Sequence, residues 1–301
     1  MSTINYIDAL KKRNVTFERI NEYNAMSIMQ KRYSFYKLSD FFPVFETYRS
    51  GPQKGQFVDL DFAQLVLLAD IDLSLSKIVM DICLEVEICL KTKLIYEAES
   101  YCDSDSFFSE YYAMDREYLD RTFSPGNLDI TKDEVDSNLL DRMTFYEFVS
   151  NTQFGTLERV LHAFYKKYAP VIYDAKFAPF ECHLSGIRKL RNIVAHNNSL
   201  LNRLPIRQES LSLKLLAMLG KEGIAHRTLK TNMERAIISD ACGLLYVYHS
   251  LCDNTSSLRD ALEQFDQSCC QPCKELYGKV DILVSSYTFM KKAIPIILKS
   301  T

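Results

Sequence analysis

The residues of this chain best suited to chemistry are Arg191, Asn192 and His196, which lie within six consecutive positions. A helical rotation of about 100° per residue places Asn192 and His196 on one stripe, with Arg191 one position round. A guanidinium binds phosphate oxygens, and an imidazole exchanges protons near neutral pH. We therefore expect side chains that can hold a phosphodiester and move protons on it.

RNA cleavage without a metal is the reaction that this set of groups fits best. The ribose 2′-hydroxyl attacks the adjacent phosphate, which requires proton transfer and stabilisation of added negative charge. We assign proton transfer to His196, charge stabilisation to Arg191, and orientation of His196 or the scissile group to Asn192. DNA lacks the 2′-hydroxyl, so the expected substrate is RNA. The spacing also fits a structural alternative, in which Arg191 and His196 cap or brace helices.

The segment around this motif is basic, although the whole chain has a formal net charge of −3. No acidic residue lies between Glu181 and Glu209. Nucleic-acid binding would depend on this local patch rather than on the overall charge. We expect a phosphate-binding rim made of Arg188, Lys189, Asn202, Arg203 and Arg207.

Composition and periodicity predict an all-α protein. The chain has 301 residues, of which 47% are hydrophobic, with only 9 Gly and 8 Pro, which suits a packed helical core better than an all-β fold. Thr16 is the expected N-cap of a second helix, and Asn197 with Asn198 suits a left-handed cap after the motif helix. Apolar residues recur with helical spacing in 3–12, 17–29, 61–101, 145–168, 177–196, 207–219, 231–252, 257–268 and 279–291, whereas 102–141 suggests short helices and loops.

Acidic pairs along the predicted helix 61–101 offer little support for a metal site. Asp70 and Asp72, like Glu85 and Glu87, are two residues apart, which places their carboxylates about 200° apart around a helix. We expect these acids on solvated faces. The sequence therefore predicts no metal and no cofactor.

The nine cysteines are an odd number spread through apolar helical patterns, which favours reduced thiols. Cys269, Cys270 and Cys273 have no second ligand pair close in sequence, so we expect no zinc site. The beginning of the chain lacks a basic segment followed by an apolar core, and apolar runs end before the ~20 residues of a membrane span. We expect a cytoplasmic protein without membrane contact.

Four segments resemble a known family. Leu190-Arg191-Asn192-Ile193-Val194-Ala195-His196, followed by Asn202-Arg203, resembles the signature of the Abi-like (AbiD/AbiF) abortive-infection proteins of bacteria, which are members of the HEPN superfamily. The other similar segments, in the family's order, are Tyr36-Lys37-Leu38-Ser39, the glutamate-bearing stretch 82–92 and Phe154-Gly155-Thr156-Leu157.

The resemblance implies a HEPN-type helical bundle elaborated with additional N- and C-terminal helices. We expect residues 1–205 to form this domain and residues 206–301 to form a C-terminal helical extension on the same core, with a weakly marked boundary. It also implies an endoribonuclease site made of Arg191, Asn192 and His196, usually completed by a second copy across a homodimer interface. Such proteins act in phage defence or as toxins, and an antitoxin protein or a small inhibitory RNA holds them in check.

The chain departs from the family pattern after the motif histidine. The family commonly has a second His, a Gly, an Arg and a Trp there, whereas this chain has Asn197, Asn198, Ser199 and Leu201; Lys91 stands for an arginine. A metal-independent endoribonuclease is our main expectation. The alternatives are a catalytically silent HEPN-like module that binds RNA or protein, and a structural helical scaffold.

Overall fold

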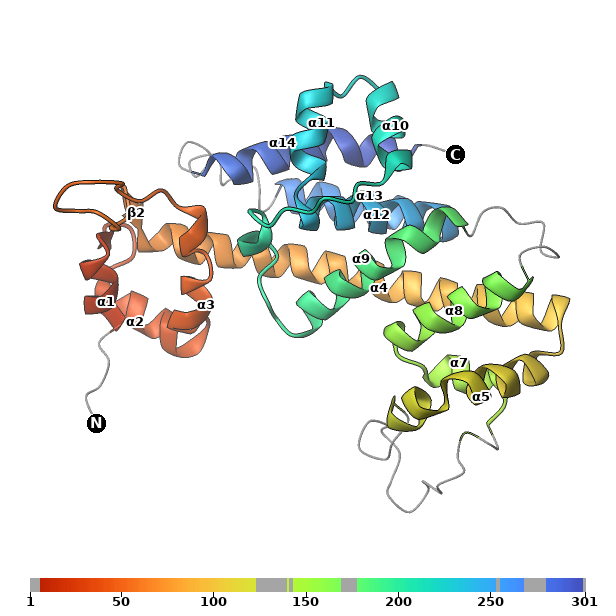
Figure 1. Cartoon of the computed structure of the whole chain (residues 1–301). Helices are drawn as coiled ribbons and strands as arrows, with labels where there is room; N and C mark the ends of the chain where they lie inside the picture. Colours follow the sequence, from red (N-terminus) through yellow and green to blue (C-terminus); the bar gives the residue numbers. More distant parts are fainter. Residues whose placement is uncertain are drawn as a thin grey trace, which may run out of the picture. The chain divides into compact units, whose positions relative to one another are not determined.

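A computed structural model describes residues 6–122, 140, 143–168, 178–252, 255–267 and 280–299. Within these residues the chain forms thirteen α-helices, two short 3-10 helices and one pair of two-residue strands (Figure 1). The all-α prediction is confirmed. The HEPN-type arrangement of the bundle stays a prediction.

The elements are named here with their bounds. The α-helices are α1 (Tyr6–Lys12), α2 (Glu22–Lys31), α3 (Phe35–Ser39), α4 (Phe62–Tyr101), α5 (Ser104–Thr122), α7 (Phe145–Asn151), α8 (Phe154–Tyr168), α9 (Ala178–Ala195), α10 (Leu213–Lys221), α11 (His226–Met233), α12 (Ala236–Leu251), α13 (Thr255–Phe265) and α14 (Asp281–Ile297). The 3-10 helices are η1 (Phe42–Val44) and η2 (Leu201–Arg203), and the parallel strands are β1 (Val15–Thr16) and β2 (Leu60–Asp61).

The chain divides into two compact units. The first, unit 1, consists of Met1–Cys83 and Lys189–Thr301, and the second, unit 2, is Leu84–Arg188. Helices α4 and α9 therefore each contribute residues to both units. The boundary expected between residues 205 and 206 stays a prediction.

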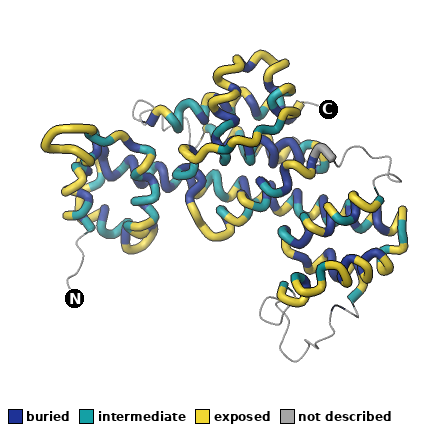
Figure 2. Tube along the Cα trace, viewed as in Figure 1, coloured by how far each residue is buried: buried dark blue, intermediate teal, exposed yellow. Residues whose placement is uncertain are grey.

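The core of unit 1 surrounds α12, which is buried along most of its length (Figure 2). Tyr248 of α12 and Phe289 of α14 are among the largest fully buried side chains. The buried guanidinium of Arg235 donates to Ser285 Oγ at 2.9 Å and to Ser286 Oγ at 2.5 Å, so it ties the start of α12 to α14. These contacts fix the helices that follow the motif in the chain.

Unit 2 has an aromatic core. Phe107 and Phe108 of α5 contact rings of the helices around them, and the Phe108 and Phe148 rings stack with centroids 4.5 Å apart. Helix α7 begins with a capping box, in which Thr144 and Glu147 satisfy each other's backbone amides. Aromatic burial thus supplies the packing of this small unit.

One local prediction is wrong. Thr16 does not cap α2: it lies in β1 and donates to Asp61 at 3.0 Å, while Asn21 caps α2. Strand pairing with a segment more than forty residues away overrides the local capping signal. Residues 104–122 lie in α5, whose backbone is non-helical at Asp115 (φ −121°, ψ 24°), so a kink divides it into two shorter helices, as the prediction of short helices has it. Cys269, Cys270 and Cys273 lie outside the described residues.

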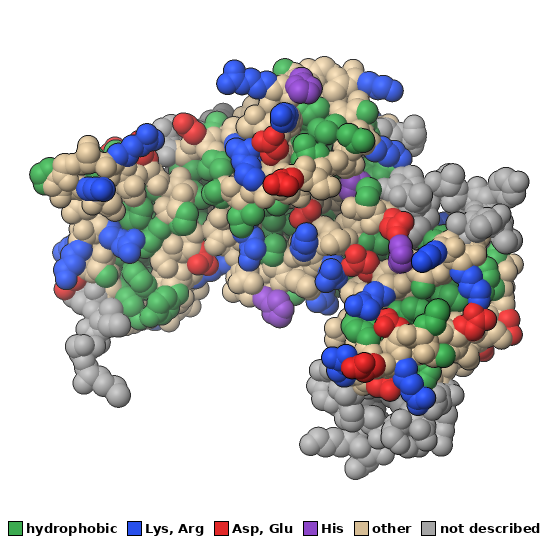
Figure 3. Space-filling view, viewed as in Figure 1, with side chains coloured by type: hydrophobic (Ala, Val, Ile, Leu, Met, Phe, Trp, Pro, Cys, Tyr) green, Lys and Arg blue, Asp and Glu red, His purple; other side chains and the backbone are tan. Residues whose placement is uncertain are grey.

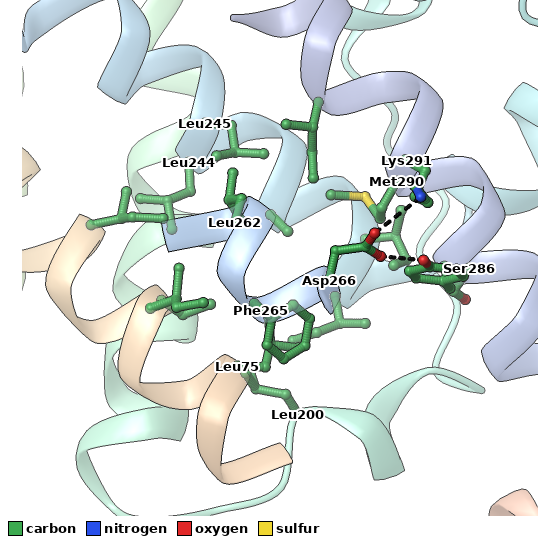
Figure 4. Close-up of a pocket in the computed structure, with 18 of the residues that line it drawn as sticks. Leu75, Leu200, Leu244, Leu245, Leu262, Phe265, Asp266, Ser286, Met290 and Lys291 are labelled. Atoms are coloured by element: carbon green, nitrogen blue, oxygen red, sulfur yellow. Dashed lines mark hydrogen bonds and ion pairs between the residues drawn. The ribbon is translucent and has the colours of Figure 1, made fainter. Parts of the chain in front are cut away.

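An apolar cavity of about 540 Å³ lies in unit 1 and is lined from α4, α12, α13 and α14 (Figure 4). Leucines such as Leu75, Leu244 and Leu262 make up much of its wall. At its edge Asp266 pairs with Lys291 at 3.1 Å and also accepts from the Tyr287 hydroxyl. The cavity offers few uncommitted polar groups to a phosphate, so it is not the candidate site for the predicted chemistry.

Candidate functional site

The motif helix α9 ends in a left-handed turn. Asn197 has a φ of 52°, and its amide donates to the Val194 carbonyl at 3.0 Å. The Asn198 amide donates to the Ile193 carbonyl at 2.9 Å, which completes a Schellman cap. The predicted asparagine cap is therefore confirmed. His196 is the last residue before the chain reverses, and its side chain is exposed.

A buried carboxylate holds the segment that follows this cap. Asp72 of α4 is only 1% exposed, and its Oδ1 accepts from the amides of Leu200 at 2.8 Å and Leu201 at 2.9 Å. The same oxygen accepts from Ser199 Oγ at 3.1 Å. The prediction that Asp72 lies on a solvated face is wrong. Three protein donors replace water around the carboxylate, which allows its burial.

Lys37 completes this arrangement from α3. Its ammonium lies 3.4 Å from Asp72 Oδ2 and donates to the Asn197 carbonyl at 3.0 Å. It therefore balances the buried charge and binds the left-handed turn. Ser199 Oγ also accepts from the Asn202 amide at 3.1 Å, at the start of η2. We call Asp72 and Lys37 the loop clamp.

Neither clamp residue was a predicted site residue. The signal that pointed toward Lys37 is its place in Tyr36-Lys37-Leu38-Ser39, one of the four segments that resemble the family. Asp72 has no comparable signal, because its three donors lie about 130 positions further along the chain. Ser199, a departure from the family pattern, is one of those donors.

The motif side chains are uncommitted. Those of Arg191, Asn192 and His196 form no hydrogen bond or ion pair with any described residue, and the same holds for Arg203 in η2. The Nε of Arg191 is buried without a hydrogen-bond partner there. A buried donor without a partner costs about 1–3 kcal/mol. The structure does not join the guanidinium and imidazole directly.

Two of the five predicted rim residues are held in ion pairs. Arg188 Nε lies 2.8 Å from Glu158 Oε2, with both residues in unit 2. Arg207 Nη1 lies 3.1 Å from Glu234 Oε2 and also donates to the Thr231 carbonyl at 3.0 Å. An acid at hydrogen-bond distance weakens the attraction of either cation for phosphate.

The other three rim residues lie in unit 1 with the motif. Lys189 is exposed, while Asn202 and Arg203 are half-buried in η2, directly after the clamped loop. Burial raises the pKa of the Asp240 carboxyl, and the charge of Lys189 partly opposes that rise. Lys189 therefore lies in the field of an acid. Of the motif and rim cations, Arg191 and Arg203 are left without an acidic partner among the described residues.

A second group of titratable side chains lines a cavity of about 610 Å³ in unit 2. His162 is exposed and pairs with Glu181. Each cation there has a carboxylate partner: the pairs are Arg159 with Asp115, Arg188 with Glu158 and His162 with Glu181. These pairs satisfy one another, so the cavity offers little net field to an anion.

The described residues contain neither a candidate metal site nor a candidate membrane-spanning helix. They contain no group of three or more His, Cys, Asp or Glu side chains arranged to hold a metal ion. No helix among them combines the length and the apolar character needed to cross a membrane.

Fold and motif together define a class of protein. It is an all-α protein in which Arg, Asn and His lie at the end of one helix, and a buried acid holds the loop that follows this helix. The family model described as "Abi-like protein" matches residues 29–202, which is more than half of the chain, and the chain belongs to this family. The matched region contains both clamp residues and the whole motif. A search of the curated proteins and one of the solved structures gave no match. Membership indicates an abortive-infection type of function.

Proposed function

We propose that this Abi-like protein is a metal-independent endoribonuclease of the HEPN superfamily, which acts in phage defence or as a toxin. One contrast supports the proposal most. The loop clamp fixes the backbone from Asn197 to Leu201, while the Arg191, Asn192 and His196 side chains have no partner among the described residues. A fixed backbone that carries uncommitted side chains suits a preorganised site for an external phosphate.

In the proposed reaction the 2′-oxygen attacks the adjacent phosphorus, and the bond from phosphorus to the 5′-oxygen breaks. His196 takes the proton from the 2′-hydroxyl or delivers one to the leaving 5′-oxygen. Arg191 stabilises the negative charge that builds up on the phosphate, and Asn192 orients the imidazole or the scissile group. The products are one RNA end with a 2′,3′-cyclic phosphate and one with a 5′-hydroxyl.

One imidazole cannot act as base and acid in the same step. In a homodimer with two facing motifs, the same histidine of the second copy would supply the other proton transfer. An antitoxin protein or a small inhibitory RNA would keep such an activity silent in uninfected cells. Among the motif and rim cations, Arg191 and Arg203, which have no acidic partner among the described residues, would contribute most to phosphate binding.

The test is RNA cleavage by the purified protein in EDTA. We expect the wild type to leave 2′,3′-cyclic phosphate ends, and Arg191→Ala and His196→Ala each to lose about 100-fold or more in rate. His226→Ala and Arg227→Ala are matched controls, because both residues are exposed on α11 outside the motif. Cleavage that survives both motif changes, or that needs a divalent metal, would overturn the mechanism. RNA retention without cleavage would favour the catalytically silent module.

A further inference from the structure

A partly exposed group of aromatic rings lies in the N-terminal part of unit 1. The rings of Tyr6 and Phe35 stack with centroids 4.8 Å apart and planes at 13°. The Tyr36 ring meets Tyr6 edge-on at 6.4 Å and Phe35 edge-on at 5.8 Å. Tyr36 is nevertheless 65% exposed. We call these three residues the aromatic platform.

The platform adjoins the motif loop. Tyr36 immediately precedes Lys37 in α3, and the Lys37 ammonium donates to the Asn197 carbonyl, one residue beyond His196. The Lys37 side chain thus connects the helix that carries Phe35 and Tyr36 to the motif loop, and platform and loop both belong to unit 1. We infer that an RNA chain with a phosphate at His196 can extend its neighbouring nucleotides toward Tyr36.

The charge around the platform suits a polyanion. Residues 6–57 contain nine Lys or Arg and five Asp or Glu, whereas the whole chain has more acids than bases. The Arg13 guanidinium lies over the Phe42 ring at 5.1 Å, so cations and rings are interleaved there. Figure 3 shows hydrophobic side chains gathered at the surface over α2 and α3, with Lys and Arg side chains close by.

We propose that the aromatic platform binds the bases of single-stranded RNA and thereby makes unpaired RNA the substrate class of the motif. This inference rests on the proposed function. The bases of a duplex are stacked on one another, whereas unpaired bases can stack on an exposed ring while nearby cations bind the phosphates. A ring that already packs against two others is held in place, so it loses little freedom when a base binds.

Binding is measured with the His196→Ala protein, which is expected to bind RNA without cutting it, and a short unstructured oligoribonucleotide carrying a fluorophore. In this background Tyr36→Ala is expected to weaken binding about 5- to 100-fold, the range found for the loss of one base-stacking ring. Tyr36→Phe keeps the ring and is expected to bind as before. Tyr36→Leu keeps an apolar side chain without a ring, and we expect the same loss as for alanine.

Tyr23→Ala is the matched control. Tyr23 lies on α2 in the same lobe and is 84% exposed, but none of the ring contacts among the described residues involves it. It is expected to leave binding unchanged. A fully paired RNA of the same composition is expected to bind more weakly than the unpaired one and to be insensitive to Tyr36→Ala.

Several results would overturn the proposal: equal affinity of all variants, wild-type-like binding by Tyr36→Leu, an equal loss for duplex RNA, or no RNA binding at low salt. Melting temperatures of the variants show whether any loss comes from unfolding. Cleavage by the wild type in EDTA is scored separately. The absence of cleavage contradicts the ribonuclease proposal. The RNA affinities of the Tyr36 variants test the platform proposal.

Discussion

Arg191 has a buried donor that lowers the stability of the fold, and its proposed role is to stabilise the charge on the phosphate. Its Nε is buried and has no hydrogen-bond partner among the described residues, whereas nearby Arg188 and Arg207 each have a carboxylate partner. A group that weakens the fold but supplies a donor is typical of functional positions. This contrast, rather than the number of cations, distinguishes Arg191 from Arg188 and Arg207.

Replacing Arg191 by methionine should separate stability from activity. The change removes the buried unpaired N–H while keeping an unbranched side chain, so we expect the free energy of unfolding to stay constant or rise by up to about 1 kcal/mol. RNA cleavage should fall about 100-fold or more. Urea unfolding and initial cleavage rates measure the two effects. A loss of several kcal/mol in stability would instead show that Arg191 braces the helices.

At the scale of elements, the loop clamp connects three segments that are distant in sequence. Asp72 of α4 binds the amides that lead into η2, and Lys37 of α3 binds both Asp72 and the turn that ends α9. Lys37 is 16% exposed, so its ion pair is only weakly screened. The position of the loop after His196 therefore depends on these two side chains.

Asp72→Asn is expected to release this loop. The change leaves the largely buried Lys37 without its counter-charge, and breaking such a pair costs about 3 kcal/mol. Hydrogen exchange at the Leu200 and Leu201 amides should accelerate, and kcat for RNA cleavage should fall more than KM changes. Lys37→Arg keeps the charge, and it should retain most of the activity.

Asp61→Asn is the matched control for this experiment. Asp61 is also a buried acid of unit 1, and it accepts from the Thr16 hydroxyl at 3.0 Å and from the Glu18 and Ala63 amides at 2.9 Å. Its loss should lower stability without lowering kcat. If both variants reduced kcat equally, or if the two loop amides exchanged as in the wild type, Asp72 would have no special role in positioning the loop.

For the whole molecule, the proposed composite site makes activity depend on pairs of chains. If both copies of His196 serve one site, a dimer with a single altered chain is inactive. Subunits mix at random in a two-fold homodimer, so an equimolar mixture of wild type and His196→Ala, after exchange, should keep about a quarter of the activity. Independent sites would keep half. Sedimentation of the same mixture checks that the dimer has formed.

Local features were predictable from the sequence. The long helix α4 follows from continuous apolar periodicity, and the cap after α9 follows from asparagine's tolerance of the left-handed conformation. Both depend on residues that are neighbours along the chain. The family resemblance likewise rested on short local segments, and the family match over residues 29–202 agrees with it.

Only the tertiary structure decided which partners the charged groups have. The sequence alone placed the all-α fold, the motif and its asparagine cap, but Asp72 looked like a solvated acid and Arg188 and Arg207 looked like free cations. Their partners lie from about 25 to 130 positions away in sequence. Helical periodicity reports which face of a helix is apolar, whereas the energy of a buried charge depends on the donors and acceptors that packing brings to it.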